Sequence, residues 1–312
     1  MELRLEGLPS TVFVIAGPTA VGKTRLTLEL ASRTGAEIVI ADSRQVYRGF
    51  DIGTAKPTAI EQGRVRHHLV DCVGPGDAIS AGSWYRRFEA VAADARSRSI
   101  PLIVTGGSTL YVDTLLNGPS PIPPLASSTR AVLEDEYAQP RGPEALFDEL
   151  TKSDPAIART LDSTKRQRLI RYVGVLRETG SLPSLLQADA RKLKLKTHVI
   201  VLFRPRKELY QRIERRVDSM IESGLLEEVQ ALLGRGAADT LASTIGYQEL
   251  LPVLDGTRSL EDGIRLVKRN TRRYAKRQLT WFRRYPSATW MDARTTTPER
   301  VLEIAASRPT QK

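Results

Sequence analysis

Residues 17–24 have the spacing of a phosphate-binding loop. They fit G-x-x-x-x-G-K-[ST], follow the apolar run 12–16 and precede a segment with helical spacing, 25–33. The glycines let backbone N–H groups turn toward a phosphate, Lys23 adds a positive charge, and Thr24 can hold Mg²⁺. A glycine-rich turn would not explain Lys23-Thr24. The loop predicts a phosphate site, without saying which phosphate, from Gly17, Pro18, Thr19, Ala20, Val21, Gly22, Lys23 and Thr24.

One carboxylate is expected beside this loop. Asp42 follows the strand-like segment 37–41, whereas the strand-like segment 102–105 ends in Thr-Gly-Gly-Ser with no acid. A nucleoside triphosphatase usually has an acid after a second strand, where it holds Mg²⁺ and orients the attacking water. In a kinase Asp42 would be a metal ligand or a base, and in another transfer reaction it would deprotonate the acceptor. An aspartate that only caps the strand end is the structural alternative.

The elements that must position these residues indicate an α/β fold. Strand-like segments alternate with helical ones, such as 85–98, which predicts a P-loop-type core with a parallel sheet flanked by helices. Four prolines lie within 119–124 and interrupt that alternation. Only helical patterns follow, with starts at Ser127, Gly142 and Ser153.

The domain organisation follows from that interruption. We expect residues 1–118 and 197–312 to form the catalytic core and residues 119–196 to form an all-helical insertion. The run 199–203 is apolar throughout, as in a buried parallel strand. Beyond it, 209–233 has the pattern of one long amphipathic helix.

Charge and composition narrow the partners. The chain of 312 residues has a formal net charge of +11 and a pI near 9.9. Residues 1–118 carry 13 basic and 12 acidic side chains, and the rest carries 34 and 24, so the second part is expected to face a polyanion. No apolar run could span a bilayer, and residues 1–8 lack a secretory pattern. The single cysteine, Cys72, fits a reducing compartment, so we expect a cytoplasmic protein without a membrane partner.

Two segments concentrate the positive charge. Residues 265–284 contain nine Arg or Lys and no acid, at a spacing that places Arg272, Arg273, Lys276 and Arg277 on one helix face. Residues 155–198 contain ten basic and three acidic side chains, and Gln167-Arg168 with Arg171 lies on one helical turn. A basic surface that only keeps the protein soluble is the alternative to RNA binding.

The segment 42–57, DSRQVYRGFDIGTAKP, resembles the signature of the tRNA dimethylallyltransferases, also called tRNA isopentenyltransferases. Further matches follow in order: His67-His68-Leu69-Val70-Asp71, the segment 105–111, Ile245-Gly246-Tyr247-Gln248-Glu249 and the basic segment 271–284. The resemblance covers about residues 12–285 and is closest to the bacterial type. Departures are Arg44, Ser108-Thr109, and the absence of Asn-Asp before Gln167. With Cys72 as its sole cysteine, the chain cannot form the zinc finger of some eukaryotic relatives.

The resemblance implies transfer of a dimethylallyl group from dimethylallyl diphosphate to N6 of the tRNA adenine immediately 3′ of the anticodon, with release of diphosphate. It assigns Asp42 as the base, places Ser108 in the reaction channel and gives Arg216 to the diphosphate. From the phosphate loop itself, we expect Lys23, the loop amides and Mg²⁺ as cofactor to stabilise the charge on the departing diphosphate. It implies that the insertion grips the anticodon stem-loop and that the protein is a monomer. The tRNA contacts expected from the resemblance and the basic faces are Asp42, Ser43, Arg44, Gln45, Ser108, Arg130, Gln167, Arg168, Leu169, Ile170, Arg171, Arg272, Arg273, Lys276 and Arg277.

Three other functions remain open from the residues alone. A prenyltransferase acting on free adenine nucleotides would share the phosphate loop but would need neither the basic helix nor the insertion. A small-molecule kinase would leave the 42–57 signature unexplained. A non-enzymatic RNA-binding NTPase switch would explain the charge but not the missing acid after 102–105.

Overall fold

The chain divides into two compact units, residues 1–116 with 194–312, and residues 117–193. The expected boundaries lay at 118/119 and 196/197. The computed structural model describes residues 11–188 and 196–307. The segment 1–8, used above for the expectation of no secretory pattern, and residues 189–195, part of the second basic segment, lie outside the described residues. Among the described helices, none combines the length and apolar composition needed to cross a membrane.

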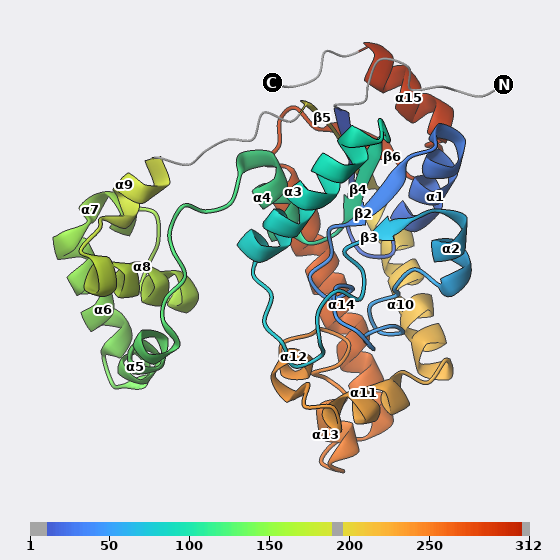
Figure 1. Cartoon of the computed structure of the whole chain (residues 1–312). Helices are drawn as coiled ribbons and strands as arrows, with labels where there is room; N and C mark the ends of the chain where they lie inside the picture. Colours follow the sequence, from blue (N-terminus) through green and yellow to red (C-terminus); the bar gives the residue numbers. More distant parts are fainter. Residues whose placement is uncertain (1–10, 189–195, 308–312) are drawn as a thin grey trace. The chain divides into compact units, whose positions relative to one another are not determined.

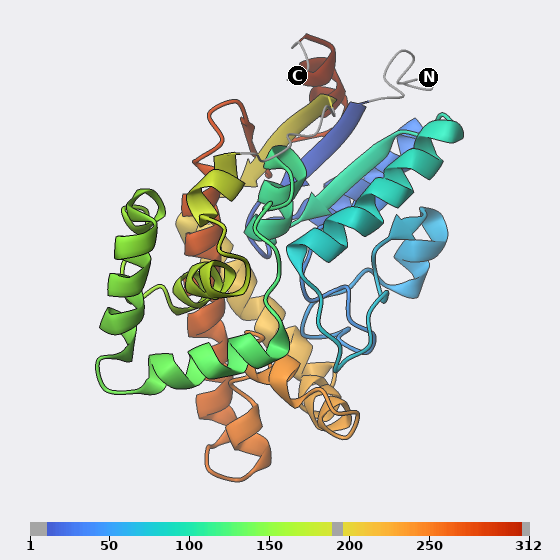
Figure 2. The same cartoon turned by 60° about the vertical axis from the view of Figure 1, so that its left-hand side comes forward.

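The larger unit contains a six-stranded sheet in the order β3-β2-β4-β1-β5-β6. All five strand pairs are parallel, which confirms the expected α/β fold class. Val12 of β1 is in register with Leu102 of β4 and Thr197 of β5, and Figure 2 shows β1 in blue beside the yellow β5. The strands are β1 Thr11–Ala16, β2 Glu37–Ile40, β3 His67–His68, β4 Leu102–Gly106, β5 Lys196–Phe203 and β6 Thr289–Asp292.

Helices cover both faces of this sheet. Figure 1 shows α3 and α4 on one side of the strands and α1 on the other. Side chains alternate along β1, so that Phe13 and Ile15 join a core with Leu26 and Leu30 of α1. The helices of this unit are α1 Lys23–Thr34, α2 Ala59–Arg64, α3 Ala81–Ser97, α4 Thr109–Asn117, α10 Arg206–Glu222, α11 Leu225–Leu233, α12 Ala238–Ala242, α13 Leu251–Leu254, α14 Leu260–Phe282 and α15 Pro298–Ser307.

Two expected helices differ from those observed. The helix expected over 85–98 begins at Ala81, because Ser80 caps it by accepting a hydrogen bond from the Ser83 N–H. The single helix expected over 209–233 was wrong, since α10 ends at Glu222 and α11 begins at Leu225. Gly224 separates them with a φ of +94°, a left-handed conformation that interrupts a helix and that glycine adopts without strain.

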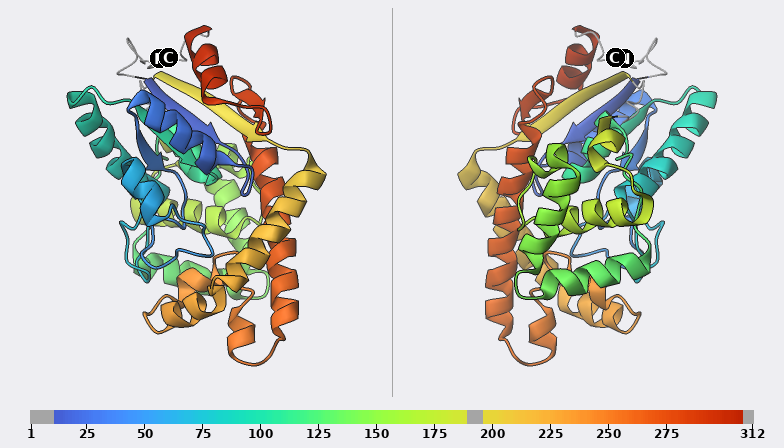
Figure 3. Two further views of the ribbon diagram at one scale, coloured as in Figure 1. Left: turned by 90° about the vertical axis from the view of Figure 1, so that its right-hand side faces the viewer. Right: turned by 90° about the vertical axis from the view of Figure 1, so that its left-hand side faces the viewer.

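The two long helices α10 and α14 lie side by side below the sheet (Figures 1 and 3). The hydroxyl of Ser259 caps α14 by accepting a hydrogen bond from the Asp262 N–H, and Glu261 and Asp262 suit the positive end of the helix dipole. The smaller helices α11, α12 and α13 lie near the first turns of α14 (Figure 1). This arrangement brings residues of α10 and α14 to the carboxyl edge of the parallel strands.

Helices are the only regular secondary structure in the described part of the smaller unit. Its core includes Leu133 of α5, Leu146 of α6 and Val173 of α8. The helix start expected at Ser153 was wrong: α6 ends there, and Asp154 caps the next helix by accepting a hydrogen bond from the Ile157 N–H. The helices are α5 Ser127–Ala138, α6 Gly142–Ser153, α7 Pro155–Ala158, α8 Arg166–Thr179 and α9 Pro183–Ala188.

Candidate active site

A cavity of about 1360 Å³ lies within the larger unit. The parallel strands β1, β2 and β4 all end at this edge of the sheet, which is where α/β proteins bind their ligands. The walls come from the phosphate loop, residues 42–45, residues 51–59, the end of β4, α10 and α14. Its apolar lining includes Leu28, Ile38, Ile40, Ile213 and Val217.

The phosphate loop joins β1 to α1 without distortion of either element. Gly17 has a φ of +148°, and a Cβ at this position would lie 2.7 Å from the carbonyl oxygen of Leu202, so only glycine fits. The Lys23 ammonium donates hydrogen bonds to the carbonyl oxygens of Gly17 and Pro18, both at 2.9 Å. The Lys23 ammonium therefore lies against the loop, beside the backbone amides at the start of α1.

Three side chains distant in sequence fix this loop from outside. Arg204 Nε donates to the Val21 carbonyl at 2.8 Å, and Arg212 Nε donates to the Ala20 carbonyl at 2.9 Å. The Gln278 carboxamide accepts from the Thr19 N–H at 3.0 Å. Sequence reasoning missed all three braces, because the motif names the loop but not the residues that pack behind it.

Lys23 and Arg216 are two of the cations that line the cavity without forming an ion pair to a described residue. Burial lowers the pKa of the Lys23 ammonium to about 8, although the negative charge of Asp42 opposes this shift. Burial also lowers the pKa of the Arg216 guanidinium, with Asp42 again opposing the shift. Within residues 11–188 and 196–307, Arg216 has no hydrogen bond or ion pair, and its side chain lines the cavity. An anionic group entering the cavity would meet both cations.

Asp42 combines the two interpretations that the sequence left open. Its Oδ1 accepts from the backbone N–H of Arg44 at 2.9 Å and of Gln45 at 3.4 Å, so one oxygen caps the turn after β2. No described residue donates to Oδ2, and Asp42 lines the cavity. A carboxylate held by one oxygen and open at the other can accept a proton from a ligand.

The neighbours of Asp42 are held by the protein. Arg44 donates to the Ser243 carbonyl at 3.0 Å. The Gln45 carboxamide donates to the carbonyls of Thr54 at 3.0 Å and Ala55 at 3.3 Å. Ser43, Arg44 and Gln45 all line the cavity. The resemblance assigned these side chains to RNA, and the structure shows that two of them also support the cavity wall.

Ser108, which the resemblance places in the reaction channel, is adjacent to the cavity lining but not part of it. The lining includes Thr105, Gly106 and Gly107 but not Ser108. Ser108 is buried, and its N–H donates to the Ala41 carbonyl at 3.2 Å. Its backbone thus joins the ends of β2 and β4 behind the wall.

Helix α14 contributes one face to the cavity that sequence reasoning did not assign. Val267, Thr271, Tyr274 and Gln278 line it at spacings of three and four residues. Burial raises the pKa of the Tyr274 phenol, so the phenol remains protonated at neutral pH. The regular spacing of these residues was the available signal, but the basic residues between them drew attention to the opposite face.

The basic face of α14 is divided. Lys268 pairs with Asp218 and Arg272 pairs with Glu214, both acids on α10, so this edge of the face is neutralised within the protein. Arg273, Lys276 and Arg277 are exposed. Of the four α14 residues expected to contact RNA, these three present accessible charge.

The smaller unit corrects part of the expected RNA contacts. Leu169 and Ile170 are fully buried in its helical core, so their side chains do not face a ligand. Arg171 donates to the Ile122 carbonyl, and burial lowers its pKa. Gln167 and Arg168 are exposed.

Arg130 and the two consecutive histidines, His67 and His68, each contact another residue of the protein. Arg130 lies 4.0 Å from Glu134 one turn along α5. His68 Nε2 lies 2.7 Å from Glu37, and His67 Nδ1 lies 2.8 Å from the Val65 carbonyl. The described residues include no cluster of three or more His, Cys, Asp or Glu side chains that could bind a metal ion.

Comparisons with known proteins agree with this geometry. The model of the IPP transferase family matches residues 45–285. A tRNA dimethylallyltransferase of Pelodictyon phaeoclathratiforme is 42% identical over 91% of this chain and 92% of its own length. One from Geobacter sulfurreducens is 42% identical over 92% of this chain and 93% of its own.

Solved structures are similar over nearly the whole chain. A full-length tRNA isopentenylpyrophosphate transferase from Bacillus halodurans aligns with a TM-score of 0.68 and 37% identity, covering 95% of each chain. A eukaryotic dimethylallyltransferase studied while acting on tRNA aligns with a TM-score of 0.82 and 28% identity, covering 97% of this chain and 81% of the other.

Proposed function

Because the chain belongs to the IPP transferase family, we propose that it transfers a dimethylallyl group from dimethylallyl diphosphate to N6 of the tRNA adenine immediately 3′ of the anticodon (position 37). The observation that carries the chemistry is that the phosphate loop, Arg216 and the open oxygen of Asp42 line one cavity. This arrangement supports a site for an anionic leaving group beside a base for the acceptor.

The leaving group is a diphosphate, so the phosphate loop serves without hydrolysis of a nucleotide. As the C–O bond of the dimethylallyl group breaks, charge develops on the departing diphosphate oxygen. Lys23, Arg216 and the amides at the start of α1 stabilise that charge where it forms. The loop carbonyls fixed by Arg204 and Arg212 keep this set of donors in place.

The acceptor is a weak nucleophile, because the lone pair of an exocyclic amine is delocalised into the purine ring. Asp42 accepts one N6 proton while N6 forms its bond to the dimethylallyl carbon, which gives dimethylallyl-adenine and diphosphate. The adenine must leave the base stack of the anticodon loop to reach the cavity. Ser43, Arg44 and Gln45 form the wall beside Asp42 and would contact this base.

Mg²⁺ fits the residues present as a substrate-associated ion. The exposed Thr24 lines the cavity at the start of α1 and would bind the ion through its hydroxyl, with diphosphate oxygens and water completing the coordination. When bound, the ion neutralises charge on the leaving group.

The tRNA is held by charges outside the cavity. Arg273, Lys276 and Arg277 of α14 and Arg168 with Gln167 of α8 are accessible to the phosphate backbone. We propose that the smaller unit binds the anticodon stem-loop, that the protein acts as a monomer, and that it works in the cytoplasm. The net charge of +11 supports a polyanionic substrate.

The test is an acceptor comparison. Purified protein is incubated with Mg²⁺, radiolabelled dimethylallyl diphosphate and unmodified tRNA carrying adenine 3′ of the anticodon, with AMP and ATP in parallel. Label in tRNA alone supports the proposal. Label in nucleotide alone identifies a nucleotide prenyltransferase, and ATP consumption without label identifies a kinase.

A further inference from the structure

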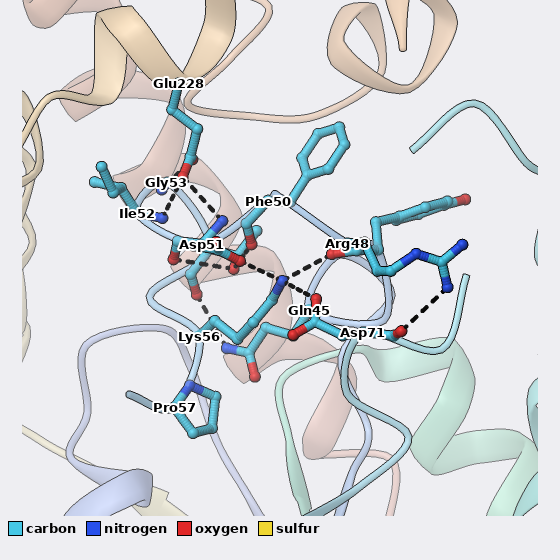
Figure 4. A network of polar contacts seen from close by, with 12 residues as sticks. Gln45, Arg48, Phe50, Asp51, Ile52, Gly53, Lys56, Pro57, Asp71 and Glu228 are labelled. Atoms are coloured by element: carbon cyan, nitrogen blue, oxygen red, sulfur yellow. Dashed lines mark hydrogen bonds and ion pairs between the residues drawn. The ribbon is translucent and has the colours of Figure 1, made fainter. Parts of the chain in front are cut away.

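Glu228 accepts four hydrogen bonds, although it lies in α11 and outside the phosphate loop and the 42–45 turn. Its Oε2 accepts from the backbone N–H of Asp51 at 3.0 Å and of Ile52 at 2.8 Å. Its Oε1 accepts from the Gly53 N–H at 3.1 Å and from the Tyr247 hydroxyl at 2.6 Å. Figure 4 shows the carboxylate reaching down to this backbone turn.

The Glu228 carboxylate binds backbone N–H groups rather than a cation. Three successive N–H groups converging on one point form a site for an anion, and no described Lys or Arg forms an ion pair with Glu228. Burial and the negative charge of Glu228 both raise the pKa of Tyr247, so its phenol stays a donor. Gly53 permits this packing, since a Cβ there would lie 2.5 Å from the Tyr247 ring.

The same turn continues into the cavity wall. The Ala55 N–H donates to the Ile52 carbonyl at 2.9 Å, and the Lys56 N–H donates to the Asp51 carbonyl at 3.0 Å. The Lys56 ammonium is buried and contacts the carboxylates of Asp51 and Asp71 (Figure 4). Contacts on both sides of the turn therefore hold the backbone of residues 54 and 55 in place.

Those two positions set the direction of the Gln45 carboxamide. Its NH₂ group donates to the carbonyls of Thr54 and Ala55, and the reverse orientation would place oxygen against oxygen. The amide oxygen of Gln45 accepts no hydrogen bond from the described residues, and Gln45 lines the cavity. It offers an acceptor to a donor such as the exocyclic amine of adenine.

We propose that Glu228 is a positioning residue for the acceptor adenine. It holds the 51–53 amides, and through the Thr54 and Ala55 carbonyls it keeps the Gln45 amide oxygen available to a base that carries an amine at C6. This inference rests on the proposed function. A base with a carbonyl at C6, such as inosine, would place oxygen against that oxygen and bind less well.

The experiment compares Glu228→Gln with Glu227→Gln, its exposed neighbour on α11. In Glu228→Gln, whichever oxygen becomes NH₂, two donors lose their acceptor and face another donor. We measure kcat and KM for tRNA at saturating dimethylallyl diphosphate, KM for the diphosphate at saturating tRNA, Tm, and inhibition by tRNA with inosine at the acceptor position. Amide hydrogen exchange of residues 51–53 is followed in parallel.

Glu228→Gln is expected to lower kcat/KM for tRNA by about tenfold or more. The KM for the diphosphate should stay near the wild-type value, exchange at 51–53 should speed up, and the preference for adenine over inosine should shrink. Tm should fall, because two donors lose their acceptor. Tyr247→Phe removes one donor without adding a facing one, so its effect should be smaller. Glu227→Gln should match the wild type.

An unchanged kcat/KM for tRNA in Glu228→Gln overturns the inference. A rise in the KM for the diphosphate as large as the rise for tRNA also overturns it, because Glu228 would then support the whole cavity rather than position the adenine. Both outcomes leave the proposed function intact. Absence of transfer to tRNA by the wild-type protein overturns the proposed function and this inference with it.

Discussion

The two ends of the cavity differ in how their polar groups are used. At the phosphate end, Arg216 has no partner among the described residues, and Lys23 bonds only to loop carbonyls. At the acceptor end, Arg44 and Gln45 already donate to backbone carbonyls. Under the proposed function, this difference predicts that the diphosphate is bound by a cation without an internal partner, and the base by a surface that internal hydrogen bonds hold in one shape.

The sharpest test of this contrast is substitution of Asp42, the acceptor-end residue whose Oδ2 accepts no hydrogen bond from the described residues. Asp42→Asn keeps an oxygen that can cap the turn but removes the base, so we expect kcat to fall by about 10²- to 10⁴-fold. Binding of tRNA, measured by filter retention, should change little.

Glu89→Gln, at an exposed acid of α3, is the control and should behave as wild type. Transfer by Asp42→Asn at the wild-type rate would show that Asp42 is not the base.

Substitution at the phosphate end should affect the other substrate. Arg216→Gln is expected to raise KM for dimethylallyl diphosphate by about 10- to 100-fold, since a hydrogen bond to a charged group is lost. The KM for tRNA should be unaffected, and steady-state kinetics with each substrate varied will show this.

Lys207→Gln provides the control, because Lys207 is an exposed cation of the same helix α10 that does not line the cavity. If both substitutions raised the diphosphate KM equally, general positive charge rather than a specific contact would explain the site.

The pH dependence of diphosphate binding tests the burial of Lys23. In the free protein its pKa is about 8, and a bound diphosphate raises it. Affinity should therefore be highest below pH 8 and fall by up to about tenfold per pH unit above it, where binding must also recruit a proton. Titration calorimetry with dimethylallyl diphosphate from pH 7 to 9.5 measures this, since phosphate ionisation near pH 6 is then complete.

Lys23→Met should bind more weakly at neutral pH and lose this dependence. A slope that persisted in Lys23→Met would assign the titration to another group.

The smallest effects are expected outside the cavity, on α14. Arg273→Ala should weaken tRNA binding several-fold and reduce the salt dependence of log K by about one. The double substitution Arg272→Ala/Glu214→Ala removes a neutralised pair and should leave that slope unchanged. Binding isotherms at several salt concentrations compare them.

If the double substitution reduced the salt dependence of log K as much as Arg273→Ala does, Arg272 would contact RNA despite its ion pair.

The phosphate loop and the strands that support it could be predicted from sequence because their signals are local. Glycine spacing, an apolar run and the following helical pattern all lie within residues 12–33. The two-residue strand β3 and the mixed pattern of β6 gave no comparable signal.

The braces could not be predicted, because their partners are far apart in sequence. Glu228 acts on backbone amides of residues 51–53, and nothing in either segment names the other. The backbone N–H donor is the same in every residue except proline, so the sequence does not show which acceptor it will bind in the folded chain. Gln278 and the Thr19 amide form a second such pair.

Leu169 and Ile170 teach the opposite lesson. A motif carried over as a block included them among the RNA contacts, whereas local periodicity would have separated them. Leu169, Ile170 and Val173 share one helical stripe and are buried, while Gln167 and Arg168 lie outside it and are exposed. The helical pattern was the more reliable guide at this point.

The pairing of β1 with β5 has a consequence for synthesis. Val12 pairs with Thr197, so one neighbour of this central strand emerges from the ribosome about 185 residues after the strand itself, on the order of 10–40 s later. During that interval β1 can pair only with β4, and the nascent chain exposes an unpaired strand edge. The helical unit 117–193 is translated within this interval, so its rate of synthesis contributes to how long the growing chain is open to aggregation or to chaperones.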